Sequence, residues 1–306
     1  MNDLVIERNT FSGAVEQHGI YVGNSGDRPI IRYNNIFNNQ LNGIHVNGDI
    51  DSGDTSLPGV DGVITGARIE GNIIHGNGFG GGSGINCDGS VNAVIFNNLL
   101  YDNHASGISL YRIDGGAASI NGVIANNTII NASNARWAIN LADGAAGATI
   151  FNNILYNLNG TRGSIITAAD SDEGLISDFN LLEPQFSLEG ANLASLNAWR
   201  MATGEDMHSL SLTLTQLQAL FANYAGNDFT LAPNSLARDF GVTGLLNGTF
   251  HDAPTLDLLE RLRSLGGIID AGAFEFIPEP SAALLFGSAG LLSLGIRRPR
   301  KLSPKH

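Results

Sequence analysis

The chain has 306 residues, 39 of them glycine, only 15% charged side chains and a formal net charge of −13 at pH 7. We expect no nucleic-acid partner, because such binding depends on neutralising phosphates with Lys and Arg. Capture of a polyanionic sugar is disfavoured for the same reason, unless bound Ca²⁺ reverses the charge. Cys87 is the single cysteine, which excludes an internal disulfide. The abundant Gly and Asn adopt positive φ at little cost, so they indicate an all-β chain with many tight turns.

An internal repeat occupies the first 182 residues. Each unit has an apolar strand, an asparagine, any residue, an aliphatic or aromatic residue, a polar turn and a second strand that begins Gly-Ile or similarly. The asparagines recur at spacings of 26, 37, 26, 29, 26 and 27 residues, and they are Asn9, Asn35, Asn72, Asn98, Asn127, Asn153 and Asn180. One such unit cannot bury its apolar face alone, so we expect stacked coils that share one core.

Stacking gives the asparagine column a structural role and no catalytic one. Identical positions of neighbouring coils lie about 4.8 Å apart, so the side-chain amides form a hydrogen-bonded ladder. In the second strand, alternation predicts an inward set. Its members are Ile20, Val22, Ile44, Val46, Ile85, Cys87, Ile108, Leu110, Ile139 and Leu141. The residues between them are predicted to face outward, and they are Tyr21, His45, Asn86, Ser109 and Asn140.

The coil pattern of residues 4–182 resembles the right-handed parallel β-helix repeat proteins of the pectate-lyase-like superfamily. The resemblance implies an all-β fold, a right-handed parallel β-helix solenoid with short helices in its C-terminal cap region. That superfamily contains many polysaccharide lyases, glycosidases and epimerases, so the pattern is specific for fold and nearly silent on activity. We expect coils over residues 1–182. Strand residues directly follow residues 1–3, so we also expect further coils and a signal peptide upstream.

Residues 183–276 are predicted to form the cap. Short amphipathic helices are expected over residues 193–202 and 214–223, with Trp199 in the core. Three segments resemble parts of the cap in bacterial β-helix proteins, namely residues 203–209, the closing strand 228–231 and the final motif 270–275.

The cap region differs in one loop from the bacterial β-helix proteins that it resembles. The arginine-bearing loop that is usual between the last two motifs is replaced by a helix-like run, residues 255–265. Asp206, His208 and Asp270 are predicted to satisfy polar groups at the end of the solenoid rather than to form a site.

Residues 277–306 have three parts, which are Pro278-Glu279-Pro280, an apolar run over residues 282–296 and a basic end that begins Arg297-Arg298. This tail resembles the PEP-CTERM sorting signal of Gram-negative bacteria that make exopolysaccharide. The resemblance implies recognition by an exosortase-type membrane protease and transient anchoring in the inner membrane. Delivery to the cell surface or extracellular matrix would follow. The 15-residue run is short for a membrane span, but flanking arginines can snorkel.

The outward strip of the second strand and its following turn is the candidate site. Aromatic, amide and carboxylate groups on this strip suit a sugar chain. The predicted substrate-binding residues are Tyr21, His45, Asn86, Asp88, Tyr111, Arg112, Asn140 and Asp143, with Asn47 and Asp114 beside them.

Three functions fit this strip. The first is a non-catalytic surface or matrix protein that binds or organises polysaccharide. The second is a lyase or epimerase of uronic-acid polymers. Its catalytic candidates are His45, Asp88, Tyr111 and Arg112, with Ca²⁺ held by Asp88 and Asp114.

A lysine base is excluded for such a lyase, because the only lysines are Lys301 and Lys305. The third function, a glycosidase, would draw its two carboxylates from Asp88, Asp114 and Asp143. It is less favoured, since the usual paired-aspartate motifs are absent. We rank polysaccharide binding first, because it requires no missing base.

Overall fold

The computed structural model describes residues 2–24, 26–51, 56–246, 249–250, 253–263 and 268–278. The chain divides into two compact units, Met1–Phe276 and Ile277–His306. The tail features Glu279, Pro280, Arg297 and Arg298 lie outside the described residues, so the sorting signal stays a prediction. No helix within the described ranges is long and apolar enough to cross a lipid bilayer.

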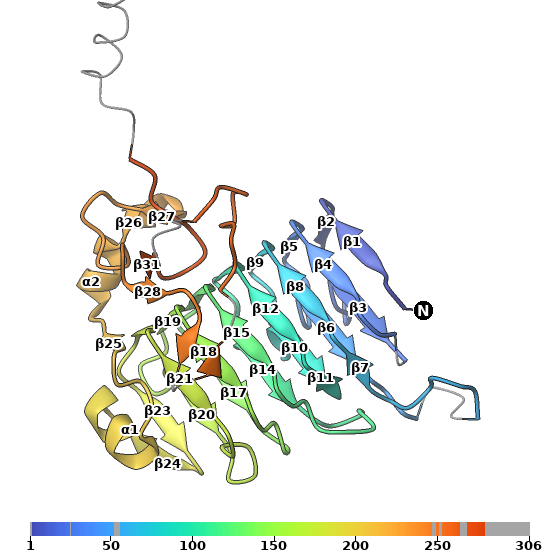
Figure 1. The fold of residues 1–306 in the computed structure, drawn as a ribbon. Helices are drawn as coiled ribbons and strands as arrows, with labels where there is room; N and C mark the ends of the chain where they lie inside the picture. Colours follow the sequence, from blue (N-terminus) through green and yellow to red (C-terminus); the bar gives the residue numbers. More distant parts are fainter. Residues whose placement is uncertain are drawn as a thin grey trace, which may run out of the picture. The chain divides into compact units, whose positions relative to one another are not determined.

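Three parallel sheets run along the stacked coils of the first unit (Figure 1). Sheet A consists of β1 Val5–Glu7, β4 Ile30–Arg32, β8 Arg68–Glu70, β12 Val94–Phe96, β15 Val123–Ala125, β18 Thr149–Phe151 and β21 Ile176–Asp178. Sheet B consists of β2 Thr10–Ser12, β5 Asn35–Phe37, β9 Ile73–His75, β13 Leu99–Tyr101, β16 Thr128–Asn131, β19 Ile154–Asn157, β22 Leu181–Leu182 and β25 Leu210–Ser211. Sheet C consists of β3 Ile20–Gly23, β6 Ile44–Asn47, β10 Ser83–Asp88, β14 Ser106–Tyr111, β17 Ile139–Leu141, β20 Ile165–Thr167, β23 Phe186–Leu188 and the antiparallel β24 Ala191–Leu193.

The predicted second strand is sheet C, and its register confirms the coil pattern. Isoleucines occupy one inward column in six consecutive coils, namely Ile20, Ile44, Ile85, Ile108, Ile139 and Ile165. All ten residues predicted to point inward are buried, including the Cys87 thiol. β-Branched side chains stack well on a pleated surface, so the repeat forms a continuous apolar interior. A further short parallel pair joins β7 Ile64–Thr65 with β11 Ser90–Val91, which follow the insertion and β10 in the chain.

The asparagine ladder is present, with one correction. Side-chain Nδ2 groups donate to the Oδ1 of the next coil at 3.0–3.1 Å in a continuous series, Asn34, Asn72, Asn98, Asn127, Asn153 and Asn180. The member in the second coil is Asn34, not Asn35, because the register aligns Asn35 with Thr10 and therefore Asn34 with Asn9. The two adjacent asparagines made the sequence ambiguous by one residue.

A second, shorter ladder lies at the turn between sheets B and C. Asn39 donates through Nδ2 to Oδ1 of Asn77 at 2.9 Å, and Asn77 donates to Oδ1 of Asn103 at 3.1 Å. The same Oδ1 atoms accept the backbone N–H of the preceding coil. This second column was not predicted, although its members are separated in the sequence by intervals of one coil.

The coils extend beyond the predicted limit of residue 182. β23 pairs in parallel with β20, and β25 pairs in parallel with β22. Phe186 replaces the usual isoleucine at the inward position of β23, so the Gly-Ile signal is absent there. Helix α1, Leu196–Thr203, then covers the end of the core, where the buried Trp199 ring stacks on Phe186 at 5.0 Å. This confirms the first predicted helix and its anchor.

Asp206 ends the long asparagine ladder. It accepts hydrogen bonds from polar groups at the end of the solenoid, as predicted. Its carboxylate accepts hydrogen bonds from Asn180 Nδ2, Ser209 Oγ and Trp199 Nε1 at 3.1, 2.6 and 2.8 Å. Asp270 similarly accepts the backbone N–H groups of Asp239 and Phe276. His208 is more exposed and contacts Asp178.

The second predicted helix is too long. Helix α2, Leu214–Ala219, ends four residues early, and Phe221–Asn223 forms β26, which pairs with β27, Asp228–Leu231. A 3₁₀ turn, Tyr224–Gly226, joins these two strands. The Phe221 ring packs edge-on against Phe229 at 5.3 Å, so hairpin packing overrides helical continuation. The predicted closing strand is confirmed as β27.

The prediction of a helix over residues 255–265 is wrong for residues 255–263, which are the part of this run that the structure describes. These residues form a loop closed by a Leu256–Leu262 bridge, in which the Asp257 carboxylate accepts the backbone N–H groups of Leu259 and Arg261. Backbone capture by an Asp side chain competes with helix formation. An arginine-bearing loop is therefore present after all, with Arg263 buried within it.

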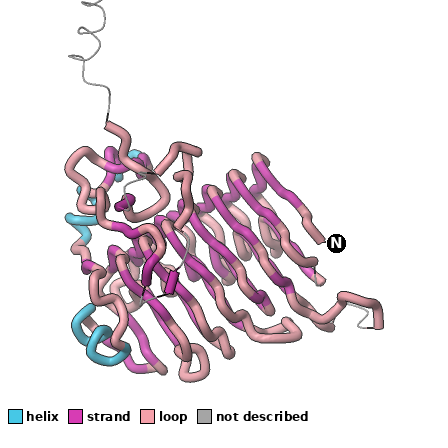
Figure 2. Tube along the Cα trace, in the orientation of Figure 1, coloured by secondary structure: helices cyan, strands magenta, loops and turns pink. Residues whose placement is uncertain are grey.

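The cap region folds back over the coils, and its helices gather toward the C-terminal end (Figure 2). Short strand pairs complete it, namely β28 Gly241–Val242 with β31 Ile268–Ile269 and β29 Leu245–Leu246 with β30 Thr249–Phe250. Cap residues such as Phe229 and Phe274 pack on outward apolar residues of sheet B, including Leu99 and Ile154. Val242 packs near Phe151 of sheet A. Among the described residues, these two apolar clusters include none from the outward face of sheet C.

Candidate functional site

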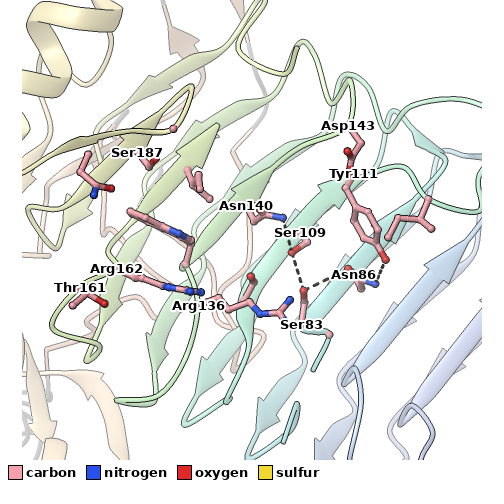
Figure 3. Close-up of a pocket in the computed structure, with 17 residues that line it drawn as sticks. Ser83, Asn86, Ser109, Tyr111, Arg136, Asn140, Asp143, Thr161, Arg162 and Ser187 are labelled. Atoms are coloured by element: carbon pink, nitrogen blue, oxygen red, sulfur yellow. Dashed lines mark hydrogen bonds between the residues drawn. The ribbon is translucent and has the colours of Figure 1, made fainter. Parts of the chain in front are cut away.

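A groove of about 790 Å³ lies on the outward face of sheet C (Figure 3). It crosses five consecutive coils, those of β10, β14, β17, β20 and β23. Its lining residues are Gly82, Ser83, Asn86, Ser106, Ser109, Tyr111, Ile113, Arg136, Trp137, Asn140, Asp143, Thr161, Arg162, Ile166, Ser187, Gly190 and Asn192. The lining is dominated by hydroxyl and amide groups, which suits a hydroxyl-rich ligand.

The floor of the groove is a connected polar network. Ser83 Oγ and Ser109 Oγ are 2.8 Å apart, and Asn140 Nδ2 donates to Ser109 Oγ at 3.4 Å. Asn86 Nδ2 donates to the Tyr111 hydroxyl at 2.7 Å (Figure 3). These side chains occupy neighbouring coils because the register aligns Asn86, Ser109 and Asn140. The network holds the polar groups in place before a ligand arrives.

The two edges of the groove differ in charge. Arg136 and Arg162 precede β17 and β20 and line the edge at the start of the strands. Tyr111 and Asp143 line the opposite edge, where the strands end (Figure 3). Asp143 is the only carboxylate among the lining residues in the part of the chain that the structure describes.

The groove brings together part of the predicted strip. Asn86, Tyr111, Asn140 and Asp143 line it, whereas four other candidates do not, and these are Tyr21, His45, Asp88 and Arg112. Tyr21 is 48% exposed and lies on the same outward column, nearer the first coil. Its hydroxyl accepts a hydrogen bond from Asn47 and contacts Asp49.

Sequence reasoning missed the arginine edge. Arg136 lies three residues before Ile139, and Arg162 lies three residues before Ile165, which is the register partner of Ile139. The two arginines are therefore 26 residues apart, one coil period. This in-phase recurrence was the available signal.

Asp88 has a structural position. Its side chain is fully buried, and its two oxygens accept the backbone N–H groups of Ile113, Asp114 and Gly115 at 2.9–3.0 Å. The carboxylate therefore fixes the turn that follows β14. No cluster of three or more His, Cys, Asp or Glu side chains forms a metal-binding arrangement in the described ranges. Both Asp88 oxygens accept backbone N–H groups, and the Asp88–Asp114 calcium site stays a prediction.

His45 is buried against other rings rather than presented to a substrate. Its Nδ1 lies 3.3 Å from His18 Nε2, and its ring packs edge-on against Tyr21. Burial, followed by repulsion from His18, lowers the pKa of His45 to about 4. The ring is therefore neutral near pH 7, but it is not among the residues that line the groove.

Tyr111 is the remaining candidate base inside the groove. Burial raises the pKa of its hydroxyl to about 12, partly offset by the hydrogen bond from Asn86. A base that remains protonated at neutral pH abstracts protons poorly. The hydroxyl is instead placed to hydrogen-bond with a ligand.

Comparison with known families agrees with the stacked coils. A family model described as a right handed beta helix region matches residues 2–180. The chain belongs to the right-handed β-helix family. A search of curated proteins found no match. Membership in this family accounts for the fold.

Proposed function

We propose that this β-helix binds polysaccharide along the groove on sheet C. One observation carries the proposal: in the described part of the chain, the outward face of sheet C is hollowed across five coils and lined by an ordered set of hydroxyl, amide and guanidinium groups. Sugars present many hydroxyl groups in a regular series, and a coil ladder repeats matching partners along its axis. A long ligand could therefore contact several coils at once.

Filling the groove tests this proposal. Replacing the half-buried Asn140 by Trp is expected to weaken polysaccharide binding by at least about tenfold, because the indole would occupy space above the floor. Retention on immobilised acidic and neutral polysaccharides would measure the effect. The matched control is Asn197→Trp on the exposed surface of α1, which should bind as the unchanged protein does. Equal binding by both variants would contradict the groove assignment.

Binding is favoured over cleavage by the groove's chemistry. Glycoside hydrolysis ordinarily uses two carboxylates, and the described lining supplies Asp143 alone. A lyase needs a base beside the sugar ring, whereas His45 lies outside the groove and Tyr111 has a raised pKa. Release of unsaturated products or reducing ends in the same assay would overturn this ranking in favour of a lyase or a hydrolase.

We also propose that the protein is exported and displayed at the surface or in the matrix of a Gram-negative bacterium. Support comes from the tail, in which Pro278-Glu279-Pro280, an apolar run and Arg297-Arg298 occur in order. An exosortase-type protease and transient membrane anchoring would act on this tail. Polysaccharide binding and surface delivery suit one another, because the polymer would be encountered outside the cell.

Changing the tail should separate delivery from folding. With a signal peptide supplied, replacing Pro278, Glu279 and Pro280 by Ala is expected to leave an unprocessed form in the membrane fraction of a host that carries an exosortase. Cell fractionation followed by immunoblotting would detect this unprocessed form. The unchanged chain should yield a shorter, surface-associated product. Identical processing of the two forms would refute the sorting proposal, and Arg112→Ala, which leaves the tail intact, serves as the control.

A further inference from the structure

The groove's two arginines occupy one column of the solenoid. The register pairs Ile139 with Ile165, and each arginine precedes its isoleucine by three residues. Arg136 and Arg162 thus lie one coil apart, which corresponds to about 4.8 Å along the axis. Both side chains are exposed and both line the groove (Figure 3).

These guanidiniums have no carboxylate partner in the described part of the chain. Six of the nine other arginines there pair with acidic side chains, and they are Arg8, Arg28, Arg32, Arg68, Arg261 and Arg263. In a chain of net charge −13, acidic partners are plentiful. Among the described residues that line the groove, the one carboxylate, Asp143, nevertheless lies at the opposite edge. The result is a local positive edge on an acidic protein.

The next position in the arginine column is Glu183, three residues before Phe186. Its side chain is buried, and its Oε2 accepts the backbone N–H of Gln185. Burial raises the pKa of Glu183 to about 7, so this carboxyl carries a reduced negative charge at neutral pH. It forms no ion pair with Arg162 in the described structure.

The loops that carry the arginines are joined to one another. Asn159 Nδ2 donates to the Ala135 carbonyl at 2.7 Å, and Asn157 Nδ2 donates to the Arg136 carbonyl. Asn159 Oδ1 also accepts the backbone N–H of Thr161 at 3.0 Å, next to Arg162. The backbone at both arginines is therefore fixed, which lowers the entropic cost of placing two cations side by side.

Resting on the proposed function, we infer that the groove selects anionic polysaccharides through Arg136 and Arg162 and without calcium. A guanidinium forms bidentate, charge-assisted hydrogen bonds with carboxylate, sulfate or phosphate groups. Two guanidiniums one coil apart match a polymer that carries such a group on successive or closely spaced sugars. This inference reverses the expectation, drawn from net charge, that a polyanion would require bound Ca²⁺.

Matched ligands and variants test the inference with the full chain in EDTA. The probes form two pairs of a charged and a neutral polymer. Polygalacturonate is compared with its carboxyl-reduced derivative, and dextran sulfate is compared with dextran. Binding to at least one charged polymer should exceed binding to its neutral counterpart, and should weaken as salt rises. Preference for polygalacturonate would assign the charged group as carboxylate, and preference for dextran sulfate would assign it as sulfate.

Arg136→Gln and Arg162→Gln should each reduce that affinity by about tenfold, and together by about a hundredfold. The matched control, Arg112→Gln, removes an exposed charge outside the groove lining and should change it little. Binding that appears only when Ca²⁺ replaces EDTA, an effect of Arg112→Gln equal to those of the two groove variants, or equal affinity for charged and neutral polymers would overturn the inference while leaving polysaccharide binding intact. Failure to bind any of the four polymers, in EDTA or in Ca²⁺, would overturn both the inference and the proposed function.

Discussion

Replacing Asn127 by Leu is expected to lower the free energy of unfolding by about 3–5 kcal/mol. Asn127 Oδ1 accepts both the backbone N–H and the side-chain Nδ2 of Asn98 at 3.0 Å. Its own Nδ2 donates to the Ile95 and Ala125 carbonyls and to Asn153. Leu has a similar shape but no polar atoms, so several groups would stay buried without partners, each at a cost of about 1–3 kcal/mol.

Denaturant unfolding followed by circular dichroism would measure this loss. Asn197→Leu is the matched control, because Asn197 is exposed on helix α1 and Leu is a good helix former. Its effect should stay within about 0.5 kcal/mol. Equal stabilities of the Asn127 and Asn197 variants would show that the ladder contributes little.

Replacing Arg263 by Met is expected to cost about 3–5 kcal/mol, as is usual when one partner of a buried ion pair is removed. The Arg263 side chain is 2% exposed and lies 3.2 Å from Glu275. It also donates to Asn97 Oδ1 at 2.7 Å and to the Gly272 carbonyl at 2.8 Å. It therefore links three segments, namely a coil turn, the 253–263 loop and the final motif.

A surface ion pair provides the comparison for Arg263. Arg8 pairs with Glu260, and the two side chains are 60% and 44% exposed. Arg8→Ala removes this ion pair and should lower the free energy of unfolding by less than about 1 kcal/mol. Chemical unfolding would give both values, and limited proteolysis should show earlier cleavage in the cap of the Arg263 variant. A loss below about 1 kcal/mol for Arg263→Met would contradict a central role for this residue in docking the cap.

The coils were predictable because their physics is local and repeated. An inward isoleucine, an asparagine at the turn and alternation along the second strand recur at nearly fixed spacing, and each copy confirms the others. Prediction was less accurate where the repeat pattern was ambiguous or interrupted. Asn34 and Asn35 are adjacent, and only strand pairing selects Asn34. The Phe186 coil was missed because an aromatic ring replaces isoleucine there.

The sequence correctly predicted that the outward face of sheet C carries polar side chains, but several of the predicted site residues do not line the groove. Alternation placed Asn86 and Asn140 on the outward side of sheet C, where they line the groove. It could not show that Asp88 turns its carboxylate toward three backbone N–H groups, or that His45 packs against His18. Those outcomes depend on loop geometry and on ring packing between coils.

The sequence by itself determined the stacked parallel coils, their inward apolar columns and the asparagine ladder, because short-range periodicity specifies them. Only the tertiary structure decided which outward face stays open. Residues from the cap, far along the chain, pack on the apolar outward side chains of sheet B, while sheet C remains hollowed. Coil stacking also brings Arg136 and Arg162 together on adjacent loops, and their 26-residue spacing is a periodic signal in the sequence. The contacts between the cap and sheet B join residues far apart in the sequence, and they leave no such signal.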